Sequence, residues 1–371
     1  MTQQVTMIFV GRLTKEKGFH LVLELLQALK QSPLVSSVHC HIFWSGALQP
    51  ELEAVLPSLP FVTFHGFQPK EAINYTRQQA DITLMPSLFL ETFGMSALES
   101  LQLGVPVVGF AKGGIMPFIF PEYQLDEQWS YTEQMLTLLT KMTNGELPDR
   151  RTDARTIANK YTEQVWMSAF KSLLGKQSGR ILLVSDYICP LGGVEQYLQN
   201  VYHLLIDHGF EVQLVGSCER PSGWKKWFNF LGSYCNIPFA LRLMHTQKQF
   251  QPDLIWRHGV QRLIGWVPLA LVPRAPQERV MYHEVGLFHP FPAQVTSEQQ
   301  LISASSLGGY LQQASSWLTP FVFVKALFGS LILSLLGRRC IQHLVPSDYL
   351  LEHGRRRLPQ AQRTTFSHFV K

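Results

Sequence analysis

Several basic residues lie close together in a short expected turn near the start of the chain. An apolar run ends at Gly11, and the segment up to Gly18 carries Arg12 and Lys17 before a helical pattern begins. Glycine allows a sharp turn at the carboxyl end of a strand, where parallel sheets place their ligands. Cations at this position would balance the charge of a diphosphate, while a solvated basic turn explains the same residues equally well.

Two glutamates with seven residues between them form a second candidate site. Glu91 falls in an expected loop, and Glu99 falls inside the helix that follows. One carboxylate could accept hydrogen bonds from a sugar and the other from a ribose. The start of the helix, at Phe93, Gly94 and Met95, would direct free N–H groups at phosphate. In the structural alternative, Glu91 only offsets the helix dipole and Glu99 lies on the surface.

Short apolar runs alternate with helical patterns along the whole chain, which is typical of parallel sheets covered by helices. The polar segment at residues 175–179 is bounded by glycines and predicts a linker, after which a second alternation begins. We therefore expect an α/β protein with domains at residues 1–174 and 180–371. The expected strands are residues 5–10, 39–43, 62–64, 82–85, 106–110, 181–185, 211–215, 254–256, 279–282 and 342–345.

The composition excludes several classes of protein. Hydrophobic residues make up 46% and charged residues 16% of the chain, which excludes a disordered chain. The length of 371 residues exceeds what one hydrophobic core usually supports. The five cysteines show no CxxC pair and no regular framework, and no uncharged apolar run opens the chain. We therefore expect reduced thiols in a cytoplasmic protein. The net charge of +5 comes without a base-reading motif, so we expect no nucleic-acid partner.

One apolar segment could meet a membrane. Residues 318–336 contain a single charge, Lys325, and the basic residues Arg338 and Arg339 follow at once. Length alone permits a span, whereas the central lysine fits a helix that lies in the membrane interface or is buried between domains. The basic cluster Arg355–Arg357 would attract lipid phosphate or form a solvated face. We therefore expect peripheral membrane association through residues 318–339 and this cluster, at the inner face of the membrane, as one alternative.

The first half of the chain resembles the donor-binding half of family 4 retaining glycosyltransferases of GT-B fold, also described as glycosyl transferases group 1. The motifs that carry the resemblance are residues 9–13, 16–18, 64–67, 91–99 and 104–108, in the family's order and spacing. The resemblance covers most of residues 1–174. It implies two Rossmann-like domains that face each other across a cleft.

The second half resembles the acceptor-binding half of the same family through shorter matches. These matches are residues 181–185, 190–195, 252–258, 282–284 and 345–350. The family normally places the acceptor half first, so the resemblance implies an inverted domain order, as in a circular permutation at an exposed linker. A fusion of two partial genes is the rival account, and the halves of two chains could then pair as a domain-exchanged dimer.

The resemblance assigns roles to matching residues. It implies that Arg12 and Lys17 hold the diphosphate of a nucleotide-sugar donor. It implies a contact with the transferred sugar for Glu91 and with the ribose for Glu99. His283 matches a histidine beside the reacting sugar, although a lone histidine at a strand end serves equally often as a structural hydrogen-bonding group.

The remaining donor contacts implied by the resemblance involve backbone groups or glycine loops. The backbone near Gly66 and Phe67 would hold the base. The other positions are Gly11, Phe93, Gly94, Met95, Gly192 and Gly193.

The implied activity is transfer of a hexose-type sugar, with retention of anomeric configuration, to a glycan or lipid-linked acceptor in cell-surface polysaccharide or lipopolysaccharide biosynthesis. We expect no metal or other cofactor, because the chain has no Asp-x-Asp and no His/Cys cluster at ligand spacing. A fused or chimeric, non-catalytic nucleotide-sugar-binding protein is the first alternative. An NAD-dependent oxidoreductase is the second, and the GxGxxG that it needs after a first strand is missing.

Overall fold

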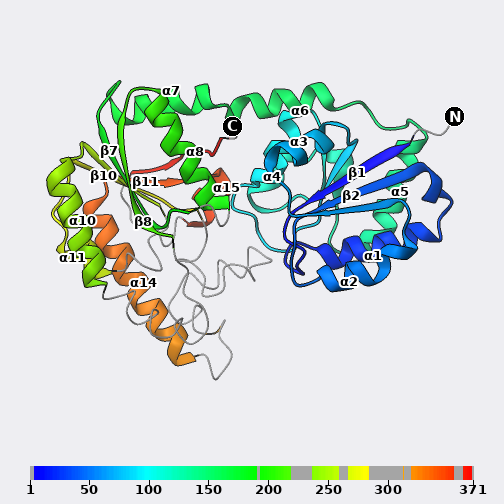
Figure 1. Cartoon of the computed structure of the whole chain (residues 1–371), viewed down its shortest axis with the longest axis horizontal. Helices are drawn as coiled ribbons and strands as arrows, with labels where there is room; N and C mark the ends of the chain where they lie inside the picture. Colours follow the sequence, from blue (N-terminus) through cyan, green and yellow to red (C-terminus); the bar gives the residue numbers. More distant parts are fainter. Residues whose placement is uncertain are drawn as a thin grey trace. The chain divides into compact units, whose positions relative to one another are not determined.

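The computed structural model describes residues 4–189, 193–218, 236–258, 266–283, 319–354 and 362–369, together with residue 312. The chain forms two compact units, Met1–Tyr161 and Thr162–Lys371. Each unit contains a six-stranded sheet whose paired strands are all parallel, with helices on both faces (Figure 1). The expected α/β class, with two Rossmann-like halves, is therefore confirmed.

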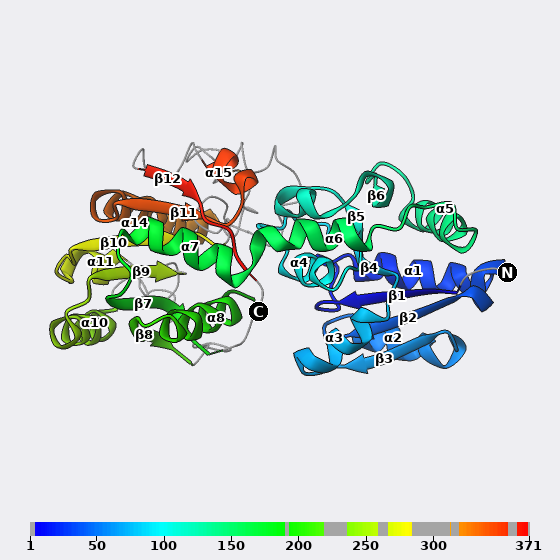
Figure 2. The ribbon, with the colours of Figure 1, turned by 90° about the horizontal axis from the view of Figure 1, so that it is seen from above.

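The first sheet has the strand order β3-β2-β1-β4-β5-β6 (Figure 2). Its strands are β1 (Val5–Val10), β2 (Val38–Phe43), β3 (Val62–Gly66), β4 (Ile82–Met85), β5 (Val107–Phe110) and β6 (Gln124–Leu125). The chain moves outward from β1 to β3 and then returns to pair β4 with the other side of β1. The carboxyl ends of β1 and β4 thus form a topological switch point, where open α/β sheets bind ligands.

Six α-helices cover this sheet in the described part of the first unit. They are α1 (Phe19–Lys30), α2 (Gln49–Val55), α3 (Lys70–Gln78), α4 (Met95–Gln102), α5 (Tyr131–Thr143) and α6 (Arg151–Ala158). Figure 1 shows α1, α2 and α5 on one face and α3, α4 and α6 on the other. Helix α1 buries a stripe of apolar residues at helical spacing, and its Phe19 ring packs 5.1 Å from the ring of Phe9 on β1. The helix that begins at the β1 turn is therefore anchored to β1 itself.

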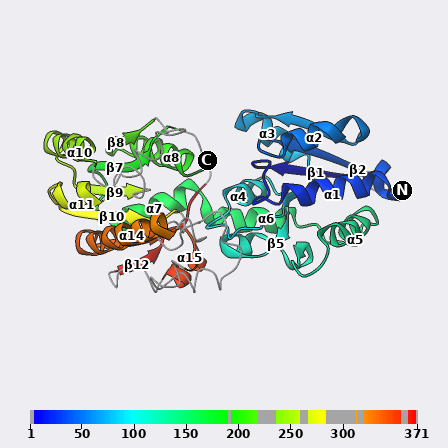
Figure 3. The ribbon, with the colours of Figure 1, turned by 90° about the horizontal axis from the view of Figure 1, so that it is seen from below.

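The second sheet has the strand order β12-β11-β10-β9-β7-β8 (Figure 2). Its strands are β7 (Arg180–Tyr187), β8 (Glu211–Ser217), β9 (Leu254–His258), β10 (Gln277–Met281), β11 (Gln342–Val345) and β12 (Gln362–Thr365). The helices are α7 (Glu163–Leu174), α8 (Gly193–Asp207), α10 (Ile237–Phe250), α11 (Trp266–Leu271), α14 (Thr319–Arg339) and α15 (Asp348–Gly354). Figure 3 shows α10, α11 and α14 in a row.

The boundary between the units lies earlier than the sequence predicts. We expected a first domain at residues 1–174, a linker at 175–179 and a second domain at 180–371, but the second unit begins at Thr162. The reason is the apolar face of α7, which buries Trp166 and Phe170 in the core of the second unit. Trp166 also donates a hydrogen bond from Nε1 to the Tyr197 hydroxyl at 3.1 Å. Residues 175–179 therefore connect α7 to β7 within one unit.

The expectation of five reduced cysteines is wrong for one pair. Cys189 and Cys218 form a disulfide, with Cα atoms 4.9 Å apart. They follow the neighbouring parallel strands β7 and β8, so sheet pairing brings together residues that sequence spacing does not relate. Cys40 and Cys340 are free and buried, and burial raises the pKa of each thiol to about 12. Cys235 lies outside the described residues.

The expected membrane-facing segment forms most of α14. No helix among the described residues is both long enough and apolar enough to cross a bilayer. Helix α14 buries Ile332 and Leu336, while Phe323, Leu327 and Leu331 are exposed at intervals of four residues. Residue 318 and the cluster Arg355–Arg357 lie outside the described residues.

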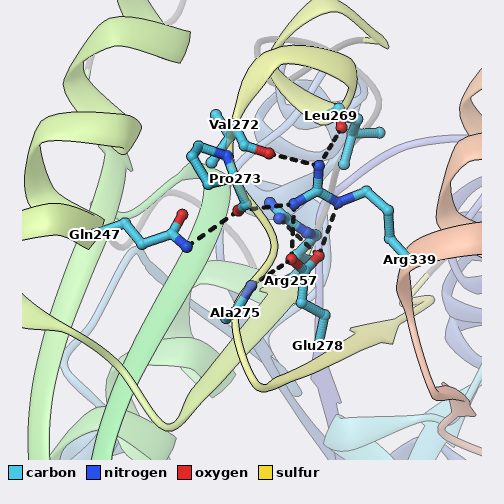
Figure 4. A network of polar contacts seen from close by, with 8 residues as sticks. All are labelled: Gln247, Arg257, Leu269, Val272, Pro273, Ala275, Glu278 and Arg339. Carbon is cyan, nitrogen blue, oxygen red and sulfur yellow. Dashed lines mark hydrogen bonds and ion pairs between the residues drawn. The ribbon is translucent and has the colours of Figure 1, made fainter.

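A buried charge network fixes the C-terminal end of α14 (Figure 4). Glu278, near the start of β10, accepts hydrogen bonds from Arg257 Nη2 at 3.1 Å and from Arg339 Nη2 at 2.7 Å. Burial alone would raise the pKa of Glu278, but hydrogen bonds from Arg339 and the charges of both arginines hold it below its ordinary value. Arg339 also donates to carbonyl groups at the end of α11, namely those of Leu269, Val272 and Pro273. One side chain therefore ties α14 to both α11 and the sheet.

Candidate functional site

Two loops meet at the switch point of the first sheet. The turn after β1 and the loop after β4 are joined by a hydrogen bond from the Leu88 N–H to the Glu16 carbonyl at 2.9 Å. Gly18, the N-cap of α1, has φ of 70°, and a Cβ there would lie 1.9 Å from the Pro86 carbonyl oxygen. Only glycine satisfies both the conformation and the close approach. Gly11, in contrast, has no positive φ and has ordinary van der Waals room for a Cβ, so the sharp turn does not depend on it.

Lys17 and Glu91 form an ion pair across these two loops. The Lys17 Nζ lies 2.6 Å from Glu91 Oε1, and the side chains are 23% and 11% exposed. The Ser87 hydroxyl donates to the same oxygen at 2.9 Å. Both contacts use Oε1, so among the described residues Oε2 keeps its acceptor sites for other partners. The two signals that the sequence analysis treated separately thus belong to one site.

A third loop holds the backbone of Glu91 in place. The Gly114 N–H donates to the Glu91 carbonyl at 2.6 Å. Gly113 has φ of 67°, and a Cβ on it would lie 2.6 Å from the same carbonyl oxygen. The loop after β5 therefore packs so closely on the loop after β4 that side chains are excluded. This loop positions the carboxylate, a role that its sequence did not suggest.

The same loop brings a second ammonium group close to the site. The Lys112 Nζ donates to the Leu88 carbonyl at 2.6 Å and forms an ion pair with Glu127. The sequence analysis missed this residue. The available signal was a lysine directly before Gly113, two residues after a predicted strand.

Glu99 lies on α4 and pairs with two cations of α3. Arg77 Nη1 lies 3.2 Å from Glu99 Oε2, and Lys70 Nζ lies 3.7 Å from Oε1. Arg77 is fully buried, and burial lowers its pKa, while Glu99 acts in the opposite direction. Because a buried guanidinium needs its counter-charge, Glu99 is more than a surface residue. Arg77 was missed, although Lys70 and Arg77 are seven residues apart and share a helix face.

Arg12 lies in the same turn as Lys17 but has a different environment. Its side chain is exposed. The pKa of Glu16 is lowered by backbone and Thr14 hydrogen bonds and, to a smaller degree, by the charge of Arg12. The Leu13 N–H donates to the Ser45 carbonyl at 3.1 Å, so the turn also contacts the end of β2.

The start of α4 has the geometry of an anion-binding helix terminus. Gly94 is the N-cap with φ of 93°, and no side chain caps the helix. A Cβ on Gly94 would lie 2.3 Å from the Ile115 side chain. Phe93 is buried edge-on against Phe118, so its side chain belongs to the core, and Met95 begins the helix. The free N–H groups of this first turn therefore point toward the carboxyl edge of the sheet.

At the far end of the edge, β3 ends in Gly66 with φ of 64°. Phe67 follows and is 68% exposed. The Gly66 carbonyl accepts a hydrogen bond from the Trp44 N–H at 2.7 Å. The residues expected near the base are thus at the same edge as the ion pair, three strands away from β4.

The residues predicted in the second unit do not form an open site among the described residues. His283 is buried, with Nε2 2.8 Å from His258 Nδ1 and Nδ1 3.0 Å from His368 Nε2. Burial lowers its pKa to about 3, so the ring is neutral near pH 7. Because both ring nitrogens are engaged, the geometry favours the structural alternative for His283. Gly193 is the first residue of α8, and Gly192 lies outside the described residues.

Comparison with known proteins finds a family similarity in the first unit. Residues 2–124 match the family model of glycosyl transferases group 1. An uncharacterised glycosyltransferase of Methanocaldococcus jannaschii is 31% identical over 127 residues, which cover 33% of this chain and 31% of that protein. The amylovoran biosynthesis glycosyltransferase AmsK of Erwinia amylovora is 30% identical over 125 residues, covering 32% of this chain and 30% of that protein.

Each of these matches covers about a third of this chain. The aligned part spans about a third of the length of the curated relatives that it matches. Among solved structures, Anabaena Alr3699/HepE in complex with UDP-glucose is 23% identical in an alignment that covers 42% of this chain and 44% of that chain, with a TM-score of 0.36. The group 1 pattern therefore coincides with the sheet whose edge holds Lys17 and Glu91.

Replacing Gly18 by alanine tests whether the two loops must touch. We expect a loss of about 3 kcal/mol or more in the free energy of unfolding, because the new Cβ meets the Pro86 carbonyl in a left-handed conformation. Gly145→Ala is the matched control, since Gly145 has the same φ of 70° with nothing within 4 Å. It should lose only about 1 kcal/mol. Equal losses in urea denaturation would show that the close approach has no energetic role.

Proposed function

We propose that this protein transfers a sugar from a nucleoside-diphosphate sugar to an acceptor. The observation that carries the proposal is the contact of Lys17 with Glu91 at the switch point, inside the region that matches group 1 glycosyl transferases. A cation and a carboxylate side by side can bind the two chemically different parts of such a donor. The ammonium suits the diphosphate, and the carboxylate suits hydroxyl groups of the sugar.

In this proposal catalysis comes from stabilisation of the departing diphosphate. Arg12 and Lys17 supply positive charge on one loop, and the N–H groups at the start of α4 face the same edge. Charge grows on the leaving group as the sugar bond breaks, so groups already in place stabilise the transition state more than the ground state. Glu91 orients the sugar and Glu99 binds the ribose. Transfer proceeds with retention, without a metal, and the departing phosphate takes the acceptor proton.

The acceptor is inferred from a relative's name and from the surface of α14. AmsK is by its name an enzyme of amylovoran biosynthesis, which supports a polysaccharide pathway. The proposed donor sugar is of hexose type, and the proposed pathway is cell-surface polysaccharide or lipopolysaccharide biosynthesis. Phe323, Leu327 and Leu331 give α14 an exposed apolar stripe, and Arg338 extends the same face with an exposed cation. Such a face suits an anionic membrane surface and therefore a glycan or lipid-linked acceptor at the inner face of the membrane.

The inverted order of the two halves is also part of the proposal. The region that matches the family model lies in the first unit, and a second Rossmann-like unit follows it. We infer that one chain supplies both halves of the enzyme as a permuted sequence. In the fusion account the protein binds a nucleotide sugar without transferring it, or two chains complete each other by domain exchange, which would make turnover depend on protein concentration.

Glu91→Gln tests the activity. We expect wild-type protein to release a nucleoside diphosphate from one of UDP-, GDP- or ADP-sugars, with or without EDTA, and we expect the variant to lose about 100-fold in rate. Thermal shift should show that the variant still binds the nucleoside diphosphate, because Lys17 remains. Glu24→Gln, an exposed change on α1, should match wild type. Stabilisation of the wild type by nucleotide without turnover would instead identify a non-catalytic binding protein.

Vesicle flotation tests the membrane part separately. Wild-type protein should float with vesicles that contain phosphatidylglycerol but not with phosphatidylcholine alone, because both apolar and anionic contacts are needed. Leu327→Glu should reduce flotation by placing a negative charge in the stripe. Ile206→Glu, at an exposed position of α8, is the control and should float as wild type does. Wild-type protein that stays unbound would remove the membrane from the proposal.

A further inference from the structure

Trp44 adopts a backbone conformation that bulky residues avoid. It follows β2 directly and has φ of 91°, in the left-handed region. Gln251, which caps α10, is the one other non-glycine residue with positive φ in the described part of the chain. The Trp44 N–H donates to the Gly66 carbonyl at 2.7 Å, which ties this conformation to the end of β3. Such strain persists only where the surroundings enforce it, and it often marks a functional position.

The strained backbone aims the Trp44 ring at Phe67. The ring centroids are 4.8 Å apart and the ring planes meet at 64°. Trp44 also packs against the core cluster that contains Ile8 and Phe43, whereas Phe67 is 68% exposed. One ring is thus anchored, and the other projects from the sheet edge. A phenylalanine with this exposure contributes little to a core, so the pair has an open aromatic surface without a partner among the described residues.

Trp44 and Phe67, here called the aromatic corner, lie next to the turn after β1 that carries Arg12 and Lys17. The Leu48 N–H donates to the Leu13 carbonyl at 2.8 Å, and a Cβ on Gly46 would lie 2.5 Å from the same oxygen. The turn after β2 therefore packs directly on the turn that carries Arg12. Three residues after Phe67, Lys70 begins α3 and pairs with Glu99.

The strand order sets these features in a row. The corner follows β3 and β2, Arg12 and Lys17 follow β1, and Glu91 follows β4, which are successive neighbours in the sheet. Strands lie roughly 4.8 Å apart, so the row from β3 to β4 spans about 14 Å. The stacking surface, the cations and the sugar-binding carboxylate thus occur in the order of base, diphosphate and sugar. The row is comparable in length with an extended nucleoside-diphosphate sugar.

We propose that Trp44 and Phe67 form the surface on which the nucleobase of the donor stacks. This inference rests on the proposed function and adds side chains to it, one of which, Trp44, no sequence pattern singled out. Every base has a flat π face, and stacking on an aromatic side chain is favourable and tolerant of base identity. The aromatic corner therefore contacts the flat face of the base, and the backbone groups near Gly66 select among the bases.

Binding of nucleoside diphosphates and inorganic pyrophosphate to the full-length protein tests the corner. Titration calorimetry of wild type should give binding of at least one of UDP, GDP and ADP. Phe67→Leu should weaken it about 10-fold and leave pyrophosphate binding unchanged, because only the base loses its contact. Tyr75→Leu, at the same 68% exposure on α3, should behave as wild type.

Trp44→Gly provides the second variant. Glycine suits the left-handed conformation, so the turn should keep its shape while the ring is lost. We expect the same selective loss of nucleoside diphosphate binding, and we expect UDP to quench less tryptophan fluorescence than in wild type. Base stacking on the aromatic corner would be contradicted if both variants kept the nucleoside diphosphate affinity of wild type. It would also be contradicted if they lost affinity equally for nucleoside diphosphate and pyrophosphate. Either result would leave the proposed function intact. A wild-type protein that binds none of the three nucleotides would overturn both.

Discussion

The ion pair between Lys17 and Glu91 is the interaction on which the site depends. It joins residues 74 positions apart and exists because β1 and β4 are adjacent parallel strands whose carboxyl ends share one edge. Both side chains are largely removed from water, so neither charge can be left unpaired at low cost. The glycines at positions 18, 113 and 114 allow three loops to approach closely enough to keep the pair in register.

Because Lys17 and Glu91 are paired, the proposed binding of the diphosphate and the proposed binding of the sugar are coupled. An anionic ligand beside Lys17 competes with Glu91 for the ammonium, and a carboxylate that loses its counter-ion gains from hydroxyl donors. Binding of a diphosphate and binding of a sugar would therefore support each other when both belong to one molecule. Lys112 pairs with Glu127, and Arg77 pairs with Glu99 on the helix that follows Glu91. The edge is thus organised before any ligand arrives.

Much of this arrangement could be predicted from the sequence, because it rests on local patterns. The apolar runs at β1 and β4, the turn with Lys17 and the spacing of Glu91 and Glu99 all lie within short segments, and alternation of strands and helices predicts a parallel sheet. The missed features depend on contacts between distant segments. Arg77 gains its role from burial against α4, and Trp44 from a hydrogen bond to β3. The position of α7 and the Cys189–Cys218 disulfide also depend on contacts between distant segments. The sequence of α7 shows an aromatic face but does not show which sheet that face covers.

Crystallographic difference density for a bound nucleoside diphosphate would test the central claim most directly. The account predicts density for the diphosphate between the turn at residues 11–18 and the start of α4, with an oxygen within hydrogen-bond distance of Lys17 Nζ. The Lys17–Glu91 distance should then exceed the 2.6 Å of the ligand-free pair. Density away from this edge, with the ion pair unchanged, would contradict the account.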